Sequence, residues 1–171
     1  TNKQIVQSSC GKFRREWETS SMKEKSYTPE NYPILRYGDV LLMLAEAENE
    51  AHQGPTDLAY ECINEIRQRA GISKLEGLSY TDFPQAVRDE RARELCFESL
   101  RKYDLVRWGI YVEAVHDKLG AATQDKRWAT GNQFIGARDY AARTQEKHQF
   151  LPIPTKELDV NGKLEQNKYW Q

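Results

Sequence analysis

Two glutamates one helical turn apart, Glu90 and Glu94, have the type and spacing that could do chemistry. At helical period they continue the apolar line through Phe83, Val87 and Phe97, so both carboxylates are predicted on the buried face of a helix. One turn also brings two carboxyl groups near the separation that acid/base pairs use in glycoside hydrolysis. A glycoside hydrolase is therefore one interpretation of this pair.

The same stretch is rich in arginine, which favours a structural interpretation over catalysis. A guanidinium group can hold a buried carboxylate through two parallel hydrogen bonds. Ion pairing lowers the pKa of a carboxyl group, whereas a general acid needs a raised pKa. We therefore predict a structural ion-pair network and no catalytic residue. The predicted members of this network are Arg36, Glu90, Arg91, Arg93, Glu94, Arg101 and Arg107.

The composition indicates one globular domain, residues 1–171, with a single core and a polar surface. The net charge is −1, and a chain without a cationic excess is not expected to bind nucleic acid. Three cysteines (Cys10, Cys62 and Cys96) and three histidines are scattered along the chain. Their spacing predicts neither a disulfide framework nor a metal site, and no cofactor is expected.

Hydrophobic periodicity predicts an all-α fold. Residues 1–31 form an irregular lead-in, and the helical period begins after them. A first helix is expected to end at Gly54-Pro55, and Thr56 is placed to cap a second helix that closes at Ala70-Gly71. So short a connection predicts an antiparallel helical hairpin.

Two further helices are predicted after this hairpin. One begins near Asp82, carries the charged stretch and runs to Gly109, and apolar residues then continue a fourth helical piece to Leu119. Two hairpins with a helix about every 20–25 residues approach the spacing of tetratricopeptide pairs, although the tetratricopeptide consensus is not matched. The predicted fold consists of tetratricopeptide-like helical hairpins with long loops.

A loop insertion is predicted over residues 120–149, where glycines break the helical period. It holds aromatic side chains beside amides, a combination that can stack on pyranose rings and hydrogen-bond their hydroxyl groups. The candidate ligand-binding residues are Trp128, Asn132, Gln133, Phe134 and Tyr140. The alternative interpretation is that these rings only anchor the loop to the helices.

Six sequence motifs carry a resemblance to a known family. They lie at residues 33–47, 66–71, 90–95, 104–109, 151–154 and 166–167. In these motifs and their order, from about residue 13 to residue 170, the chain resembles the SusD/RagB family of nutrient-binding outer-membrane lipoproteins. Where that family often has Glu-Arg-Arg, this chain has Glu90-Arg91-Ala92-Arg93.

The resemblance implies a non-enzymatic, tetratricopeptide-related protein held at the cell surface, on the outer membrane, by a lipid anchor outside this chain. It implies two partners. One is a SusC-like TonB-dependent transporter of Bacteroidetes, and the other is a glycan, oligosaccharide or peptide captured for import. Family members are several times longer, so the chain is expected to be a C-terminal part. Ligand-contacting residues vary in the family, and none is carried over by matching. The alternative function is a helical scaffold that binds a protein segment.

Overall fold

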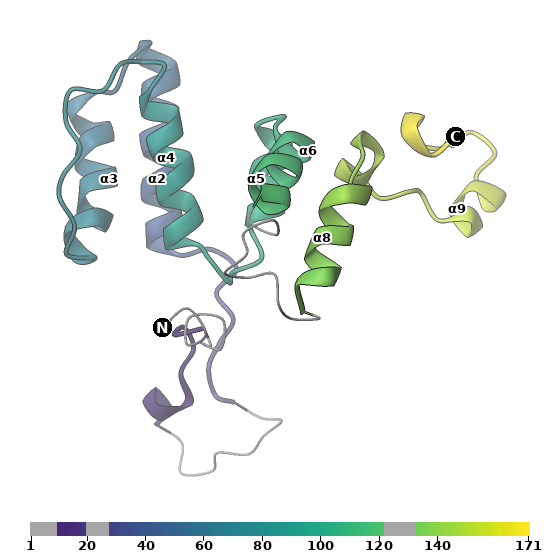
Figure 1. The fold of residues 1–171 in the computed structure, drawn as a ribbon, viewed down its shortest axis with the longest axis horizontal. Coiled ribbons are helices and arrows are strands. Elements are labelled where there is room, and N and C mark those ends of the chain that lie inside the picture. Colours follow the sequence, from purple (N-terminus) through teal and green to yellow (C-terminus); the bar gives the residue numbers. More distant parts are fainter. Residues whose placement is uncertain (1–9, 20–27, 122–132) are drawn as a thin grey trace. The chain divides into compact units, whose positions relative to one another are not determined.

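The computed structural model describes residues 10–19, 28–121 and 133–171, with the backbone alone for residues 15 and 133–135. Described residues up to Arg101 form one compact unit and those from Lys102 onward form a second, here called the N-terminal and C-terminal units. Every regular element in these ranges is helical and none is a strand, which confirms the all-α prediction (Figure 1). Each unit has an apolar cluster of its own, whereas the composition indicates a single core.

Three helices form the N-terminal unit: α2 (Tyr37–His52), α3 (Asp57–Arg69) and α4 (Phe83–Glu94), preceded by the short turn η1 (Arg15–Trp17). Helix α2 packs against both of the others. Apolar side chains at helical spacing on all three turn inward, and the following are at most 2% exposed: Leu42, Ala45, Ile63, Ile66, Phe83 and Val87. Burial of these side chains holds the three helices together.

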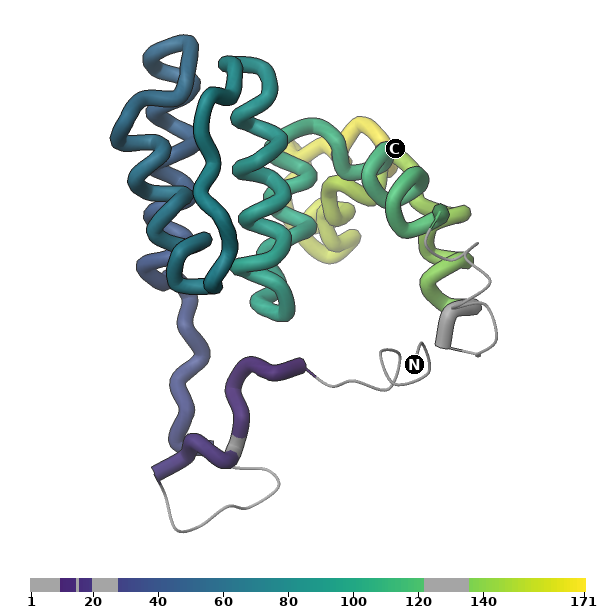
Figure 2. Tube along the Cα trace, turned by 60° about the vertical axis from the view of Figure 1, so that its left-hand side comes forward, coloured from purple at the N-terminus to yellow at the C-terminus, as the bar shows by residue number. Residues whose placement is uncertain are grey.

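The predicted hairpin of α2 and α3 is confirmed. Thr56 caps α3, because its hydroxyl accepts a hydrogen bond from the Ala59 N–H at 3.1 Å. Gly71 follows α3 with a φ of +73°, which glycine adopts without a steric penalty. The connection to α4 then runs back along α3 (Figure 2), where the Asn64 side chain donates to the Leu75 carbonyl and accepts from its N–H.

The predicted continuous helix from Asp82 to Gly109 is wrong, because α4 ends at Glu94 and the next helix begins at Arg101. Phe97 and Ser99 in the intervening turn have φ values of 64° and 62°, in the left-handed region that side chains with a Cβ rarely adopt. The turn carries Phe97 outward, where 72% of it is exposed rather than buried as predicted. Apolar spacing continued through this turn although the helical backbone did not.

The C-terminal unit contains α5 (Arg101–Arg107), which starts at the boundary, α6 (Tyr111–Ala114) and the π-helical turn η2 (Val115–Gly120). Helix α8 (Gln133–Arg143) and the turn η3 (Glu146–Gln149) follow, then α9 (Thr155–Val160) and η4 (Lys168–Trp170). Its apolar cluster is built on Leu105, Tyr111, Val115 and Ala141. None of the helices in the described ranges combines the length and apolar character needed to cross a bilayer.

The loop insertion predicted at 120–149 is corrected by α8 and η3, which lie inside it. A single glycine within a helix costs only about 1 kcal/mol relative to alanine, so Gly136 does not stop α8. After η3 the chain is extended, and the Gln166 amide fixes it by accepting from the Ile153 N–H and donating to the Ile153 carbonyl. These segments place several aromatic side chains around one pocket.

Candidate functional site

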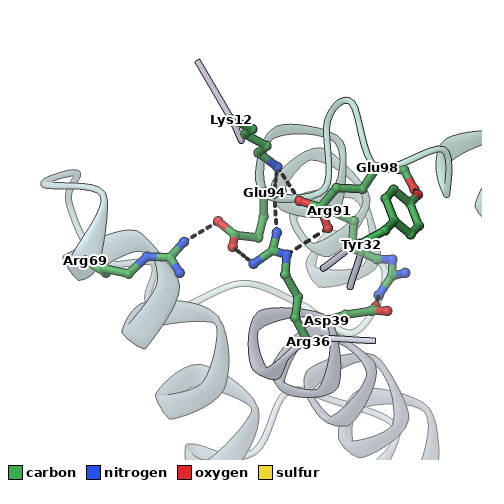
Figure 3. Close-up of polar contacts among 8 residues, drawn as sticks. All are labelled: Lys12, Tyr32, Arg36, Asp39, Arg69, Arg91, Glu94 and Glu98. Carbon is green, nitrogen blue, oxygen red and sulfur yellow. Dashed lines mark hydrogen bonds and ion pairs between the residues drawn. The ribbon is translucent and has the colours of Figure 1, made fainter. Parts of the chain in front are cut away.

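Arg36 is the centre of an ion-pair network in the N-terminal unit (Figure 3). The residue lies just before α2, and its guanidinium group contacts both the carboxylate and the backbone carbonyl of Glu94 at the end of α4. Its Nε donates to the Glu98 carboxylate at 2.7 Å. Side chains of Glu94 and Glu98 are only 9% and 4% exposed, so these charges are held largely out of water.

Three residues from elsewhere in the sequence complete the network. Arg69, at the end of α3, pairs with the other oxygen of Glu94. Lys12 pairs with the Glu98 carboxylate and donates to the Glu94 carbonyl at 2.7 Å, and the Tyr32 hydroxyl donates to the Glu98 carbonyl at 2.8 Å. Side chains from other segments therefore hold the left-handed turn at Glu94, where α4 ends, and at Glu98 within the turn. Such fixing is what a strained backbone conformation requires in order to persist.

Further ion pairs join the helices themselves. Arg91 donates to the Asp39 carboxylate at 2.8 Å, and both side chains are under a tenth exposed. Glu90, which is 2% exposed, accepts from Arg67 at 2.8 Å and lies 3.5 Å from Arg93. Each of these buried carboxylates has a guanidinium partner, which offsets the cost of removing its charge from water.

The electrostatics of this network oppose acid catalysis. Burial alone would raise the pKa of Glu94, but hydrogen bonds from Arg69 and Arg36 outweigh burial and lower it. Glu98 behaves in the same way: burial raises its pKa, and Arg36 and Lys12 bring it below the usual value. A general acid near neutral pH needs the opposite shift. The arrangement of Glu94 is therefore suited to holding structure.

The seven residues predicted to form one ion-pair network make different kinds of contact in the structure. Arg36, Glu90, Arg91 and Glu94 make the contacts described above, whereas Arg93 is largely exposed and 3.5 Å from its carboxylate. Arg101 donates to the Arg88 carbonyl at 3.1 Å. Arg107 lies in the C-terminal unit, where it pairs with Asp104 within α5 at 3.0 Å.

The predicted network lacked six participants: Lys12, Tyr32, Asp39, Arg67, Arg69 and Glu98. Glu98 had a signal, because it continues the four-residue spacing of Glu90 and Glu94. Arg67 and Arg69 lie within the motif at 66–71 and could have been considered. Nothing in the local pattern around Lys12 indicates its contact with a turn more than 80 residues away.

A pocket of about 420 Å³ opens in the C-terminal unit. Its aromatic lining comes from four separate segments: Tyr111 of α6, Tyr140 of α8, Phe150 after η3, and Trp170 of η4. Polar side chains of the lining include Lys102, Asp139, Arg143 and His148. A concave site with apolar walls and a few polar groups, in this range of volume, is typical of small-ligand sites.

Internal contacts fix two of the walls. The hydroxyl groups of Tyr111 and Tyr140 hydrogen-bond to each other, and burial together with this bond raises the pKa of Tyr111 to about 12. The Trp170 indole N–H donates to the carbonyls of Lys147 and Phe150 at 3.0 and 3.1 Å. Nζ of Lys147 lies 5.0 Å from the Trp170 ring, a cation–π contact on its face. The pocket is therefore largely pre-formed.

Of the five candidate ligand-binding residues, Tyr140 lines this pocket and is 48% exposed. Gln133 and Phe134 begin α8, but their side chains lie outside the described part of the chain. Trp128 and Asn132 are also outside it. Sequence reasoning missed the pocket residues Tyr111 and Trp170, since they follow no common period and meet only in the folded unit. Within the described residues, no group of His, Cys, Asp and Glu side chains could hold a metal ion.

Together these features define an all-helical protein with a ligand-sized aromatic pocket and buried ion pairs suited to structure. The sequence model that describes the SusD family matches residues 2–170, and the chain belongs to that family. SusD-like protein P25 of Formosa agariphila is 40% identical over 139 residues, which are 79% of this chain and 23% of that protein. SusD-like protein P2 of the same organism is 29% identical over 148 residues, 80% of this chain and 25% of that protein.

Solved structures agree with the fold. A SusD homolog from Bacteroides thetaiotaomicron superposes with a TM-score of 0.72 at 37% identity, covering 90% of this chain and 30% of that one. A SusD superfamily protein from Bacteroides vulgatus gives a TM-score of 0.62 at 30% identity, covering 85% and 28%. The resemblance to the SusD/RagB family is thus confirmed. The chain spans about a quarter of the length of the curated relatives it matches.

Proposed function

We propose that this chain is part of a non-enzymatic cell-surface protein that captures a glycan or oligosaccharide for import. The observation that carries the proposal is the aromatic pocket of about 420 Å³ in the C-terminal unit. Membership of the SusD family supports it. The proposed partner is a SusC-like TonB-dependent transporter, and the proposed attachment is to the outer membrane through a lipid anchor outside this chain.

The pocket has the chemistry that a sugar ring needs. Tyr140 and Phe150 are 48% and 51% exposed, so their rings are accessible for stacking on the apolar face of a pyranose. Polar side chains beside these rings can hydrogen-bond the equatorial hydroxyl groups. We propose that Trp128, Asn132, Gln133 and Phe134, which precede or begin α8, also contact the ligand. Their anchoring of the chain to the helices remains the alternative that the following variants separate.

Isothermal titration calorimetry with a panel of oligosaccharides tests the proposal. We expect binding without shortening of the sugar, and a loss of about 1–3 kcal/mol in binding free energy for Tyr140→Ala, with Tyr140→Phe retaining most of the affinity. Trp128→Ala should behave like Tyr140→Ala and leave the melting temperature unchanged if the ring contacts ligand. Tyr103→Ala is the matched control, because Tyr103 is 72% exposed and does not line the pocket.

Two results would overturn the proposal. One is the absence of any effect of Tyr140→Ala on binding. The other is release of reducing ends that disappears in Glu90→Gln or Glu94→Gln, which would establish a glycoside hydrolase. If Trp128→Ala keeps full affinity but lowers stability by about 3–5 kcal/mol, Trp128 is an anchor and leaves the proposed site.

A protein-binding scaffold is the second candidate function, favoured by one surface of α2. Tyr37, Val40 and Leu44 follow i, i+3, i+7 spacing and are 64%, 40% and 38% exposed. The opposite face of α2 is already buried against α3 and α4, so this helix is apolar on both sides. The paired substitution Val40→Glu and Leu44→Glu should abolish co-purification with the outer-membrane transporter and leave glycan affinity unchanged. Unchanged co-purification would remove this surface from the partner interface.

A further inference from the structure

Hydrogen-bond donors dominate the polar part of the aromatic pocket. Lys102 and Arg143 each bring a positive charge to its edge. Asp139 is the one carboxylate in the described lining, and Arg138, which does not line the pocket, lies 3.8 Å from it. The charge left for a ligand is therefore positive.

The two cations of the pocket differ from the arginines of the N-terminal unit. There, Arg36, Arg67 and Arg69 all pair with carboxylates. Within the described residues, no carboxylate lies at ion-pair distance from Lys102 or Arg143. Lys102 is instead placed over the Tyr111 ring, with Nζ 5.3 Å from the ring centre. Asp139, which pairs with Arg138, is the one carboxylate beside them in the described lining, so the two cations outnumber the acidic side chains of the pocket.

His148 supplies a third donor. The backbone N–H of Gln145 points at His148 Nδ1 at 2.9 Å, so Nδ1 is the acceptor. A neutral imidazole carries its proton on the other nitrogen, and the hydrogen-bond pattern therefore assigns that proton to Nε2. The Trp170 indole N–H, by contrast, is already used by two backbone carbonyls. A ligand suited to this lining accepts hydrogen bonds from side chains such as Lys102, Arg143 and His148 and presents an apolar face to the rings.

We infer that the pocket binds an acidic oligosaccharide, whose carboxylate or sulfate groups pair with Arg143 and Lys102 while its sugar rings stack on Tyr140 and Phe150. This inference rests on the proposed function, since it names the class of glycan that the pocket takes. A guanidinium fork matches both a carboxylate and a sulfate through two parallel hydrogen bonds. The excess of positive charge at the pocket also attracts an anionic ligand over a distance that depends on salt.

Calorimetry with three tetrasaccharides of equal length tests the inference: neutral cellotetraose, tetragalacturonate, and a sulfated carrageenan tetrasaccharide. In the wild-type chain at about 50 mM salt, at least one acidic sugar should bind about tenfold more tightly than cellotetraose, with the preference shrinking at about 500 mM. The acidic sugar that binds more tightly shows whether the pocket prefers a carboxylate or a sulfate group. Arg143→Gln and Lys102→Gln should each reduce the preference for the acidic sugar several-fold, because each weakens binding of the acidic sugar more than binding of cellotetraose. Lys163→Gln is the control, because it removes an exposed charge outside the pocket lining.

The outcomes separate this inference from the proposed function. Equal binding of neutral and acidic sugars, sensitive to Tyr140→Ala, would overturn the acidic preference and keep glycan capture. A preference for acidic sugars that survives both Arg143→Gln and Lys102→Gln would also overturn it, because charge recognition would then lie elsewhere. Failure of all three sugars and of the wider oligosaccharide panel to bind would remove glycan capture itself.

Discussion

Replacing Arg36 by methionine should lower the free energy of unfolding of the N-terminal unit by about 3 kcal/mol. Arg36 contacts the carboxylate and carbonyl of Glu94 and the carboxylate of Glu98, both of which are almost fully buried. Loss of one partner from a buried ion pair costs about 3–5 kcal/mol. Glu94 keeps Arg69 and Glu98 keeps Lys12, so the lower end of that range applies.

Urea unfolding at pH 7, followed by circular dichroism, measures this loss. Faster hydrogen exchange of the α4 amides would assign it to the N-terminal unit. The matched control is Arg14→Met, because the pair between Arg14 and Glu16 is about half exposed on both sides and should contribute less than about 1 kcal/mol. The importance of the network would be refuted if Arg36→Met cost no more than Arg14→Met.

Three further changes test the same region by urea unfolding. The pKa values of Glu94 and Glu98 lie below the usual value of 4.5, so the stability they contribute should be complete above that pH. This stability should be lost as the pH falls through the pKa values that the two carboxyl groups have in the folded protein. Glu98→Gln should make the loss of stability with falling pH shallower, and an unchanged slope would contradict the role given to Glu98. Ser99→Gly should raise the free energy of unfolding by about 0.5–1 kcal/mol, because φ is 62° there; a loss would contradict it. Gly38→Ala should lower it by about 1–3 kcal/mol, since the new Cβ would lie 2.9 Å from both Arg36 and Glu94; a neutral result would show that the network can shift.

Local patterns were sufficient for the hairpin and for part of the network. Thr56 predicted a cap and Gly71 a helix end, because each acts on the backbone within a few residues. The helical period also placed Glu90 and Glu94 on the inner face of α4, where both make their ion pairs. These features depend on short-range geometry, which the order of residues expresses directly.

The turn after α4 depends instead on contacts distant in sequence. Leu95 and Phe97 keep the apolar period, so the pattern alone favours a continuing helix. Lys12 and Tyr32 bind Glu98 from segments more than 60 residues away. These contacts hold a left-handed backbone that the local sequence disfavours, and tertiary structure therefore overrides local propensity there.

The pocket could not be assembled from the sequence for a related reason. Tyr140 was a candidate because it follows a glycine-containing stretch with other aromatics. Tyr111 and Trp170 come from short helical elements 59 residues apart in the chain and share no pattern with it. Lys102 has the sequence surroundings of an ordinary solvated residue. Only the folded C-terminal unit brings these side chains to one pocket.

Hydrogen exchange with and without a saturating oligosaccharide tests ligand capture by this pocket most directly. We expect slower exchange on ligand binding in peptides that cover residues 139–152 and 168–170, because these segments line the pocket. Exchange in α2 and α3, which belong to the other compact unit, should not change. Protection confined to α2 and α3, with none at Tyr140 or Trp170, would contradict binding in the aromatic pocket.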